Sequence, residues 1–218
     1  MAKQPVSVFS PLPQYNLLSA CGWGYILYNV ITVFPMVGQP QFFEQTKDTV
    51  TIVQCFAIIE IVNSLLGIVR SPIVTTVAQV ASRLLVVVGI FQYLPEAPGT
   101  ESYAYITLLL AWSITEIVRY LYYFCMLVYA EGTPTILILL RYNLFWVLYP
   151  TGVASELFII YSALSVAETK YSPLYKWVLI GSMITYLPGL PTLFLHMVAQ
   201  RKKVMKSLRE DASKKKKN

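Results

Sequence analysis

The chain has 218 residues, of which 56% are hydrophobic and only 13% charged, and its formal net charge at pH 7 is +6. An average soluble domain has about 25% charged residues, so this composition excludes an ordinary soluble fold. Nine of the 17 basic residues lie in the last 18 positions. That placement is typical of a tail that orients a membrane protein and contacts anionic lipid, and we expect no nucleic-acid partner.

Six apolar stretches are each long enough to cross a bilayer, which takes about 20 residues. They predict an all-α integral membrane protein, with one six-helix transmembrane domain over residues 1–200 and a basic cytosolic tail over residues 201–218. The basic tail places the C-terminus in the cytosol by the positive-inside rule, and an even number of crossings returns the N-terminus there. The predicted spans are residues 15–34, 50–69, 73–94, 103–129, 136–160 and 174–199.

Four of these spans carry polar side chains at helical spacing, which predicts a polar interior, because such stripes face one another or a cavity rather than lipid. Some of them also have a purely structural explanation. Glu116 and Arg119 can neutralise each other on one helix, and Glu60 can pair with Arg83 of the neighbouring helix. The stripes are Glu60, Asn63, Ser64 and Gly67; Thr75, Gln79, Ser82 and Arg83; Ser113, Glu116, Arg119, Tyr120 and Tyr123; and Tyr142, Tyr149 and Glu156.

Tyr149 and Glu156 are predicted to form an acid/base pair inside the fifth span. A phenol and a carboxylate are costly to bury in hydrocarbon, so they are seldom there without a task. They are about two helical turns, or roughly 10 Å, apart, and Pro150 removes a backbone donor between them. We therefore expect a kink at Tyr149–Pro150 that brings both side chains to one small group. The same break would free the N–H groups of residues 151–153 as oxyanion donors.

Four runs of the sequence resemble one family of enzymes. They are LRYNLFW at 140–146, LYPTGVASE at 148–156, AWSITEIVRY at 111–120 and HMVAQRKK at 196–203. These runs are similar to those of the very-long-chain (3R)-3-hydroxyacyl-CoA dehydratases of the endoplasmic reticulum, especially the fungal ones. The resemblance covers essentially the whole chain.

Membership would imply the third step of fatty-acid elongation, in which a 3-hydroxyacyl-CoA loses water to give the trans-2-enoyl-CoA. The catalytic Tyr and Glu of the family fall on Tyr149 and Glu156. The implied partners are the acyl-CoA substrate, membrane lipid, and the condensing enzyme, ketoacyl reductase and enoyl reductase of the cycle. The implied location is the endoplasmic reticulum membrane with both termini cytosolic, and the lysine-rich end at 215–218 resembles a dilysine retrieval signal. No metal or organic cofactor is expected.

Three divisions of the proton transfers fit these residues. Glu156 can act as the base at C2 with Tyr149 as the donor to the departing hydroxyl, the roles can be reversed, or Glu156 can serve both steps while Tyr149 steadies the thioester. Basic residues are expected to hold the CoA phosphates, although contact with lipid headgroups explains them equally well. The expected substrate-binding residues are Arg70, Arg83, Glu116, Arg119, Arg141, Tyr142 and Gly152, with Lys202 and Lys203 at the cytosolic mouth.

Other classes of protein make different demands on the sequence. A small transporter would show repeat symmetry between its halves, and the prolines of the fifth and sixth spans have no counterparts in the second and third. A non-catalytic scaffold for elongation enzymes would not need Glu156 to ionise. A tyrosine phosphatase, the activity suggested by an older name of the family, needs a cysteine six residues before an arginine. None of Cys21, Cys55 and Cys125 has one there.

Overall fold

The structure, a computed structural model, describes residues 5–69 and 72–215 of the chain. Within these ranges it is all-helical and has no strand. Arg70, one of the predicted substrate contacts, lies outside the described residues. In chain order the helices are α1 (Pro11–Thr32), α2 (Phe34–Val37), α3 (Gln41–Cys55), α4 (Ile58–Leu65), α5 (Ile73–Leu84), the π-helix η1 (Leu85–Ile90), α6 (Tyr103–Val128), α7 (Thr135–Asn143), α8 (Phe145–Lys170) and α9 (Pro173–Lys215).

Six helical stretches of the described chain are long and apolar enough to cross a membrane, so the predicted all-α, six-span fold is confirmed. Four predicted boundaries are wrong by more than four residues: the starts of the second and fifth stretches, the end of the fifth, at Lys170 rather than residue 160, and the end of the sixth, at Glu210 rather than residue 199. The second stretch begins at Gln41 rather than residue 50, because Glu44 and Lys47 pair at 2.6 Å on one helix face while Phe42 is fully buried. The fifth begins at Phe145 rather than residue 136. The six are Pro11–Val37, Gln41–Leu65, Ile73–Ile90, Tyr103–Val128, Phe145–Lys170 and Pro173–Glu210.

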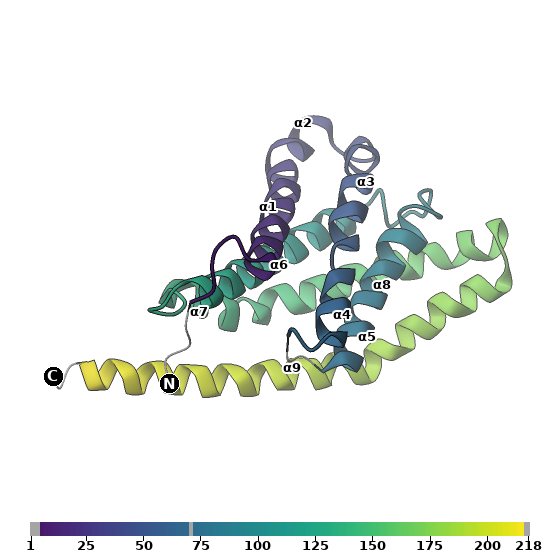
Figure 1. The fold of residues 1–218 in the computed structure, drawn as a ribbon. Coiled ribbons are helices and arrows are strands. Elements are labelled where there is room, and N and C mark those ends of the chain that lie inside the picture. Colours follow the sequence, from purple (N-terminus) through teal and green to yellow (C-terminus); the bar gives the residue numbers. More distant parts are fainter. Residues whose placement is uncertain (1–4, 70–71, 216–218) are drawn as a thin grey trace.

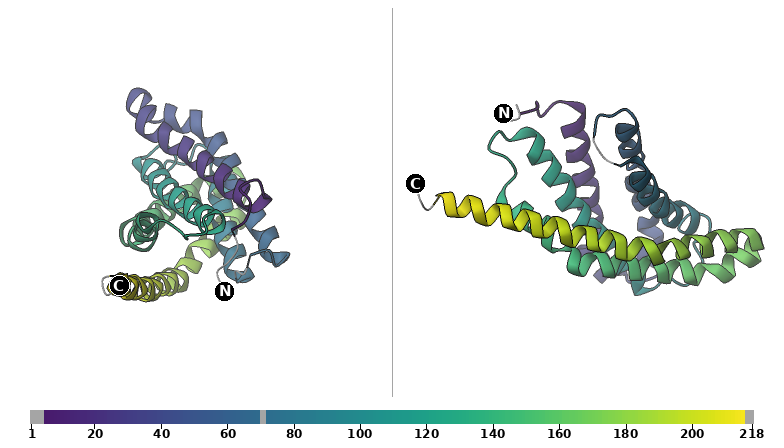
Figure 2. Two further views of the ribbon diagram at one scale, coloured as in Figure 1. Left: turned by 60° about the vertical axis from the view of Figure 1, so that its left-hand side comes forward. Right: turned by 90° about the horizontal axis from the view of Figure 1, so that it is seen from below.

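Helix α6 lies inside the bundle, with α1 packed against one side of it and α8 against another (Figure 1). Helix α9 turns back after α8 and packs along it and then along α7, as the right-hand view of Figure 2 shows. With 43 residues, α9 is about 65 Å long, whereas the hydrocarbon core of a bilayer is about 30 Å thick. The last turns of α9 therefore extend well beyond the length needed to cross a membrane.

The two described ends of the chain lie at the same end of the bundle. The backbone N–H of Val6 donates to the carbonyl of Leu127, near the end of α6, at 2.8 Å. The last turns of α9 face the start of α7, where Met205 and Thr135 line one groove. This is the arrangement that an even number of crossings produces.

At the opposite end, the loop before α6 fixes how α6 and α8 lie against each other. The N–H of Gly99 donates to Ser162 Oγ at 2.9 Å. A Cβ atom at Gly99 would overlap that oxygen and would lie only 2.9 Å from the Cα of Ile159, so only glycine fits this close approach. The resulting register brings Trp112 of α6 beside Glu156 of α8.

Candidate active site

Glu156 is buried where three helices meet, with 8% of its surface exposed. Its Oε1 accepts a hydrogen bond from the Trp112 ring N–H on α6 at 2.8 Å. Its Oε2 accepts one from the Tyr186 hydroxyl on α9 at 2.6 Å. Each carboxylate oxygen therefore has a neutral donor, and each donor comes from a different neighbouring helix.

Tyr149 lies on the same face of α8 and also faces α9. Its ring lies against Phe194, with 6.2 Å between the centroids, and its hydroxyl is 3.5 Å from the Leu190 carbonyl. That separation is beyond the usual range for a strong O–H···O bond, so the phenol is only weakly held. No hydrogen bond between described residues joins Tyr149 directly to Glu156, and a substrate placed against α9 would have to bridge them.

The kink predicted at Tyr149–Pro150 stays a prediction, but the helix is not broken there. Helix α8 runs through Pro150 without interruption, and the break lies at Leu144 instead. The ring of a proline presses on the carbonyl four residues before it, here that of Trp146, so the distortion falls in the preceding turn. Residues 151–153 are helical, and their N–H groups are therefore directed at carbonyls of α8. They are not free to serve as the oxyanion donors that we expected.

A chain of ion pairs lies next to this site and joins α4, α5 and α6. Arg83 donates to Glu116 Oε1, Arg119 Nε donates to Glu116 Oε2 at 2.7 Å, and Arg119 also pairs with Glu60 through two hydrogen bonds of 2.9 and 2.5 Å. The predicted pairing of Glu116 with Arg119 is confirmed. The predicted pairing of Glu60 with Arg83 is wrong, because Arg119 takes Glu60 and leaves Arg83 to Glu116.

Arg83 connects this ion-pair chain to the candidate site. Its guanidinium lies over the Trp112 ring at 4.1 Å and over the Trp23 ring at 5.3 Å, a favourable placement for a cation between two aromatic faces. Its Nε and Nη2 atoms are buried and have no hydrogen-bond partner among the described residues. Arg83 therefore presents two unused donors beside the tryptophan that holds Glu156.

Arg141 and Tyr142 lie in a separate aromatic cluster against α6. Arg141 Nη2 donates to the Tyr123 hydroxyl at 2.9 Å, and the guanidinium lies over the rings of Tyr122 and Tyr123 at 4.8 and 4.6 Å. The Tyr142 ring meets that of Tyr122 edge-on at 6.2 Å. The predicted roles of Arg141 and Tyr142 in holding substrate stay predictions.

Gly152 lies where α8 crosses α6. A Cβ atom there would be 3.6 Å from that of Ala111 and 3.9 Å from Trp112 Cδ1, which is ordinary contact, so a larger side chain would press on the tryptophan. The single histidine of the chain, His196, has an exposed side chain. The described residues contain no group of three potential metal-binding side chains. Because Gly152 lies next to Trp112, it leaves room for the tryptophan that donates to Glu156.

Trp112 and Tyr186 are not among the site residues that the sequence predicts. Aromatic residues are common in membrane helices as interfacial anchors, so neither residue type stands out by itself. Two signals point to them: Trp112 directly precedes Ser113 in a polar stripe, and Tyr186 stands two residues before Pro188. Only the packing of α6 and α9 around α8 shows that both contact Glu156.

A buried carboxylate with neutral donors from two neighbouring helices, inside a six-span helical bundle, defines an integral membrane protein with a candidate acid/base site between its helices. A sequence model described as "Protein tyrosine phosphatase-like protein, PTPLA" matches residues 54–207. The chain is 37% identical over 213 residues to a very-long-chain (3R)-3-hydroxyacyl-CoA dehydratase of Caenorhabditis elegans, with 92% of this chain and 96% of the relative covered.

Two further relatives agree. A probable very-long-chain (3R)-3-hydroxyacyl-CoA dehydratase of Schizosaccharomyces pombe is 37% identical over 199 residues, with 89% of this chain and 92% of the relative covered. Dehydratase 1 of Mus musculus is 32% identical over 204 residues, with 88% and 71% covered. No solved structure matches significantly. The chain belongs to the family of very-long-chain (3R)-3-hydroxyacyl-CoA dehydratases.

Proposed function

We propose that this protein dehydrates a very-long-chain (3R)-3-hydroxyacyl-CoA to the trans-2-enoyl-CoA by acid/base chemistry at Glu156 and Tyr149. Membership of the family supports the reaction. The observation that carries the choice of site is the buried Glu156 carboxylate, held by Trp112 at 2.8 Å and by Tyr186 at 2.6 Å, on the helix face that also presents the Tyr149 phenol.

In this proposal Glu156 takes the proton from C2, and the electrons of the C2–H bond form the C2–C3 double bond. The C3–O bond breaks, and the departing hydroxyl takes the phenolic proton of Tyr149 and leaves as water. Transfer of the proton from Glu156 to the Tyr149 phenolate then restores the starting state. No atom or electron is left over, and no co-reactant is needed.

The hydrogen bonds support Glu156 as the base and Tyr149 as the donor. Both oxygens of Glu156 accept hydrogen bonds, as a carboxylate does. The Trp112 N–H can only donate, so an added proton would reside on Oε2, where the Tyr186 hydroxyl can reverse and accept. Among the described residues, the Tyr149 hydroxyl has only its 3.5 Å contact with the Leu190 carbonyl, and it is free to turn toward a substrate.

The thioester oxygen gathers negative charge as the C2 proton leaves, and it needs donors. The unpartnered Nε and Nη2 groups of Arg83 support Arg83 in that role, in place of the backbone N–H groups first expected. Glu116 and Arg119 then act by holding Arg83 in position through the ion-pair chain.

The charge distribution supports cytosolic termini within the endoplasmic reticulum membrane. The end of the bundle away from the chain ends carries three basic residues, Lys47, Lys170 and Lys176. The end that holds the chain ends has the basic last turns of α9, so the positive-inside rule assigns that end to the cytosol. The CoA substrate and the other elongation-cycle enzymes would meet the protein on that side.

The test is conversion of a 3-hydroxyacyl-CoA to the enoyl-CoA by the purified protein in detergent. Tyr149→Phe and Glu156→Gln are each expected to lower turnover about 100-fold or more. Tyr161→Phe and Glu168→Gln remove the same groups from exposed parts of the same helix and serve as matched controls. Conversion that survives both site substitutions would refute the site, and a wild-type protein that binds elongation enzymes without converting substrate would be a scaffold.

A further inference from the structure

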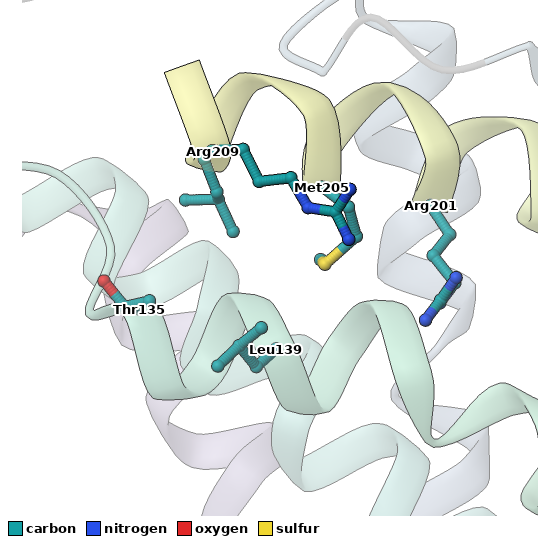
Figure 3. A pocket seen from close by; sticks show the side chains of 6 residues that line it. Thr135, Leu139, Arg201, Met205 and Arg209 are labelled. Atoms are coloured by element: carbon teal, nitrogen blue, oxygen red, sulfur yellow. The ribbon is translucent and has the colours of Figure 1, made fainter. Parts of the chain in front are cut away.

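A groove of about 360 Å³ lies between α7 and α9, at the end of the bundle where the described chain ends meet. Figure 3 shows the side chains of Arg201, Met205 and Arg209 projecting from α9 into the space above α7, with Leu139 opposite them. This groove is separate from the polar cluster around Glu156. Its lining residues are Thr135, Leu139, Arg201, Met205, Leu208 and Arg209.

The groove is lined by two arginines, three apolar side chains and one threonine. Arg201 is anchored at one end, where its Nε donates to Asn143 Oδ1 at 2.8 Å. Arg209 stands about 12 Å further along α9 and forms no ion pair with any described residue. The Arg209 side chain folds back so that its guanidinium lies beside Met205, with Leu139 of α7 opposite them (Figure 3). A ligand that fits would carry two anionic groups for the arginines and a flat or apolar part for Leu139, Met205 and Leu208.

We propose that this groove binds the nucleotide end of the acyl-CoA substrate, an assignment that rests on the proposed function. In CoA the ribose carries both a 3′-phosphate and the 5′-diphosphate, and the flat adenine extends from it to one side, so the nucleotide offers two separate anionic groups and a ring that can lie on apolar side chains. Arginine suits both phosphate groups, because its planar guanidinium can donate two hydrogen bonds to one phosphate. Arg201, nearer the reaction site, takes the diphosphate, and Arg209 takes the 3′-phosphate.

The position of the groove matches the other end of the substrate. Leu190, the contact of Tyr149 on α9, precedes Arg201 by eleven residues, or about 16 Å of helix, which is comparable with an extended pantetheine arm. Phe145, Trp146 and Phe194 form an aromatic cluster between the groove and Tyr149. A thioester at Tyr149 and Glu156 therefore leaves its nucleotide within reach of Arg201.

The experiment uses the full chain in neutral phosphatidylcholine nanodiscs and three thioesters of one acyl chain: the CoA, dephospho-CoA and pantetheine esters. Arg209→Gln is expected to raise KM for the CoA ester about tenfold and to leave KM for the other two esters unmoved, because both lack the 3′-phosphate. Arg201→Gln is expected to raise KM for the CoA and dephospho-CoA esters and not for the pantetheine ester. Lys206→Gln, which removes an exposed cation from the same helix outside the groove lining, is the matched control.

Calorimetry of free CoA, with wild type and both arginine variants, tests the groove independently of turnover. Weaker CoA binding by both variants supports the assignment of the groove. If the wild type also converts no thioester, that second result refutes the proposed dehydration and leaves the groove assignment in place. Unchanged CoA binding, or equal KM changes for all three esters, would overturn the assignment. If the arginine substitutions weaken CoA binding only in nanodiscs that contain anionic lipid, the groove is a lipid-headgroup site and the CoA assignment fails.

Discussion

The orientation of the Glu156 carboxylate depends on two side chains that are far from it in the sequence. Trp112 and Tyr186 lie 44 and 30 residues away, and each holds one carboxylate oxygen. A carboxylate oriented in this way presents its remaining lone pairs in a fixed direction. Tyr186 is therefore a positioning residue, which acts on the substrate through Glu156.

Tyr186→Phe removes the donor to Glu156 Oε2 and retains the ring. Because a hydrogen bond to a charged group contributes about 1.5–3 kcal/mol, we expect kcat to fall about tenfold or more, with KM nearly unchanged. The measurement is steady-state turnover of a 3-hydroxyacyl-CoA. Tyr175→Phe is the matched control, since its hydroxyl donates to the Gly89 carbonyl from the same helix. Equal kcat in the two variants would show that Tyr186 has only a structural role.

The sequence predicts Tyr149 and Glu156 as candidates because a phenol and an acid in a membrane helix are unusual without pairing. It cannot predict Trp112 or Tyr186 as partners, since their contact with Glu156 depends on how α6 and α9 pack against α8. The error about the N–H groups after Pro150 has a local physical cause. A proline predicts strain in a helix, but its ring presses on the carbonyl four residues earlier, so the turn before the proline takes up the distortion and the residues after it stay helical.

At the scale of elements, the ion-pair chain holds α4, α5 and α6 together. Its members alternate in sign, from Glu60 through Arg119 and Glu116 to Arg83. Two tyrosine hydroxyls complete the partners of Glu60, Tyr120 at 2.6 Å and Tyr15 at 3.3 Å. Three helices are thus joined by charges that would be costly to leave unpaired in a membrane.

Arg119→Gln removes the central cation and leaves two carboxylates without their shared partner. We expect the free energy of unfolding to fall by about 3 kcal/mol, measured as thermal unfolding in detergent. The control is Lys47→Gln, which breaks the more exposed pair with Glu44 and is expected to cost less than about 1 kcal/mol. A higher KM at unchanged stability would instead place Arg119 in contact with substrate, as first expected from the sequence.

Hydropathy predicts the number of spans well because lipid imposes one requirement on every crossing helix. It places the start of α3 too late, because it counts Glu44 and Lys47 as separate charges although they pair on one face. It cannot predict η1, a π-helix directly after α5. There the Tyr175 hydroxyl reaches the carbonyl of Gly89 at 2.5 Å, a contact between segments 86 residues apart.

At the scale of the whole molecule, the charge difference between the two ends of the bundle predicts its orientation. A glycosylation acceptor placed in the loop at residues 95–101 is expected to be modified in microsomes, because that loop faces the lumen in the proposed orientation. Acceptors added at either chain end are expected to stay unmodified. Glycosylation of either chain end would contradict cytosolic termini and would also place the groove at Arg201 on the wrong side for CoA.

The contact between Trp112 and Glu156 also makes the site optically observable. The chain has four tryptophans, and Trp112 is the one whose indole N–H is bonded to the carboxylate and whose face carries a guanidinium. Indole emission responds to nearby charge. In a variant that keeps Trp112 and replaces Trp23, Trp146 and Trp177 with phenylalanine, a change in fluorescence would report the arrival of a thioester and the protonation of Glu156 without any label.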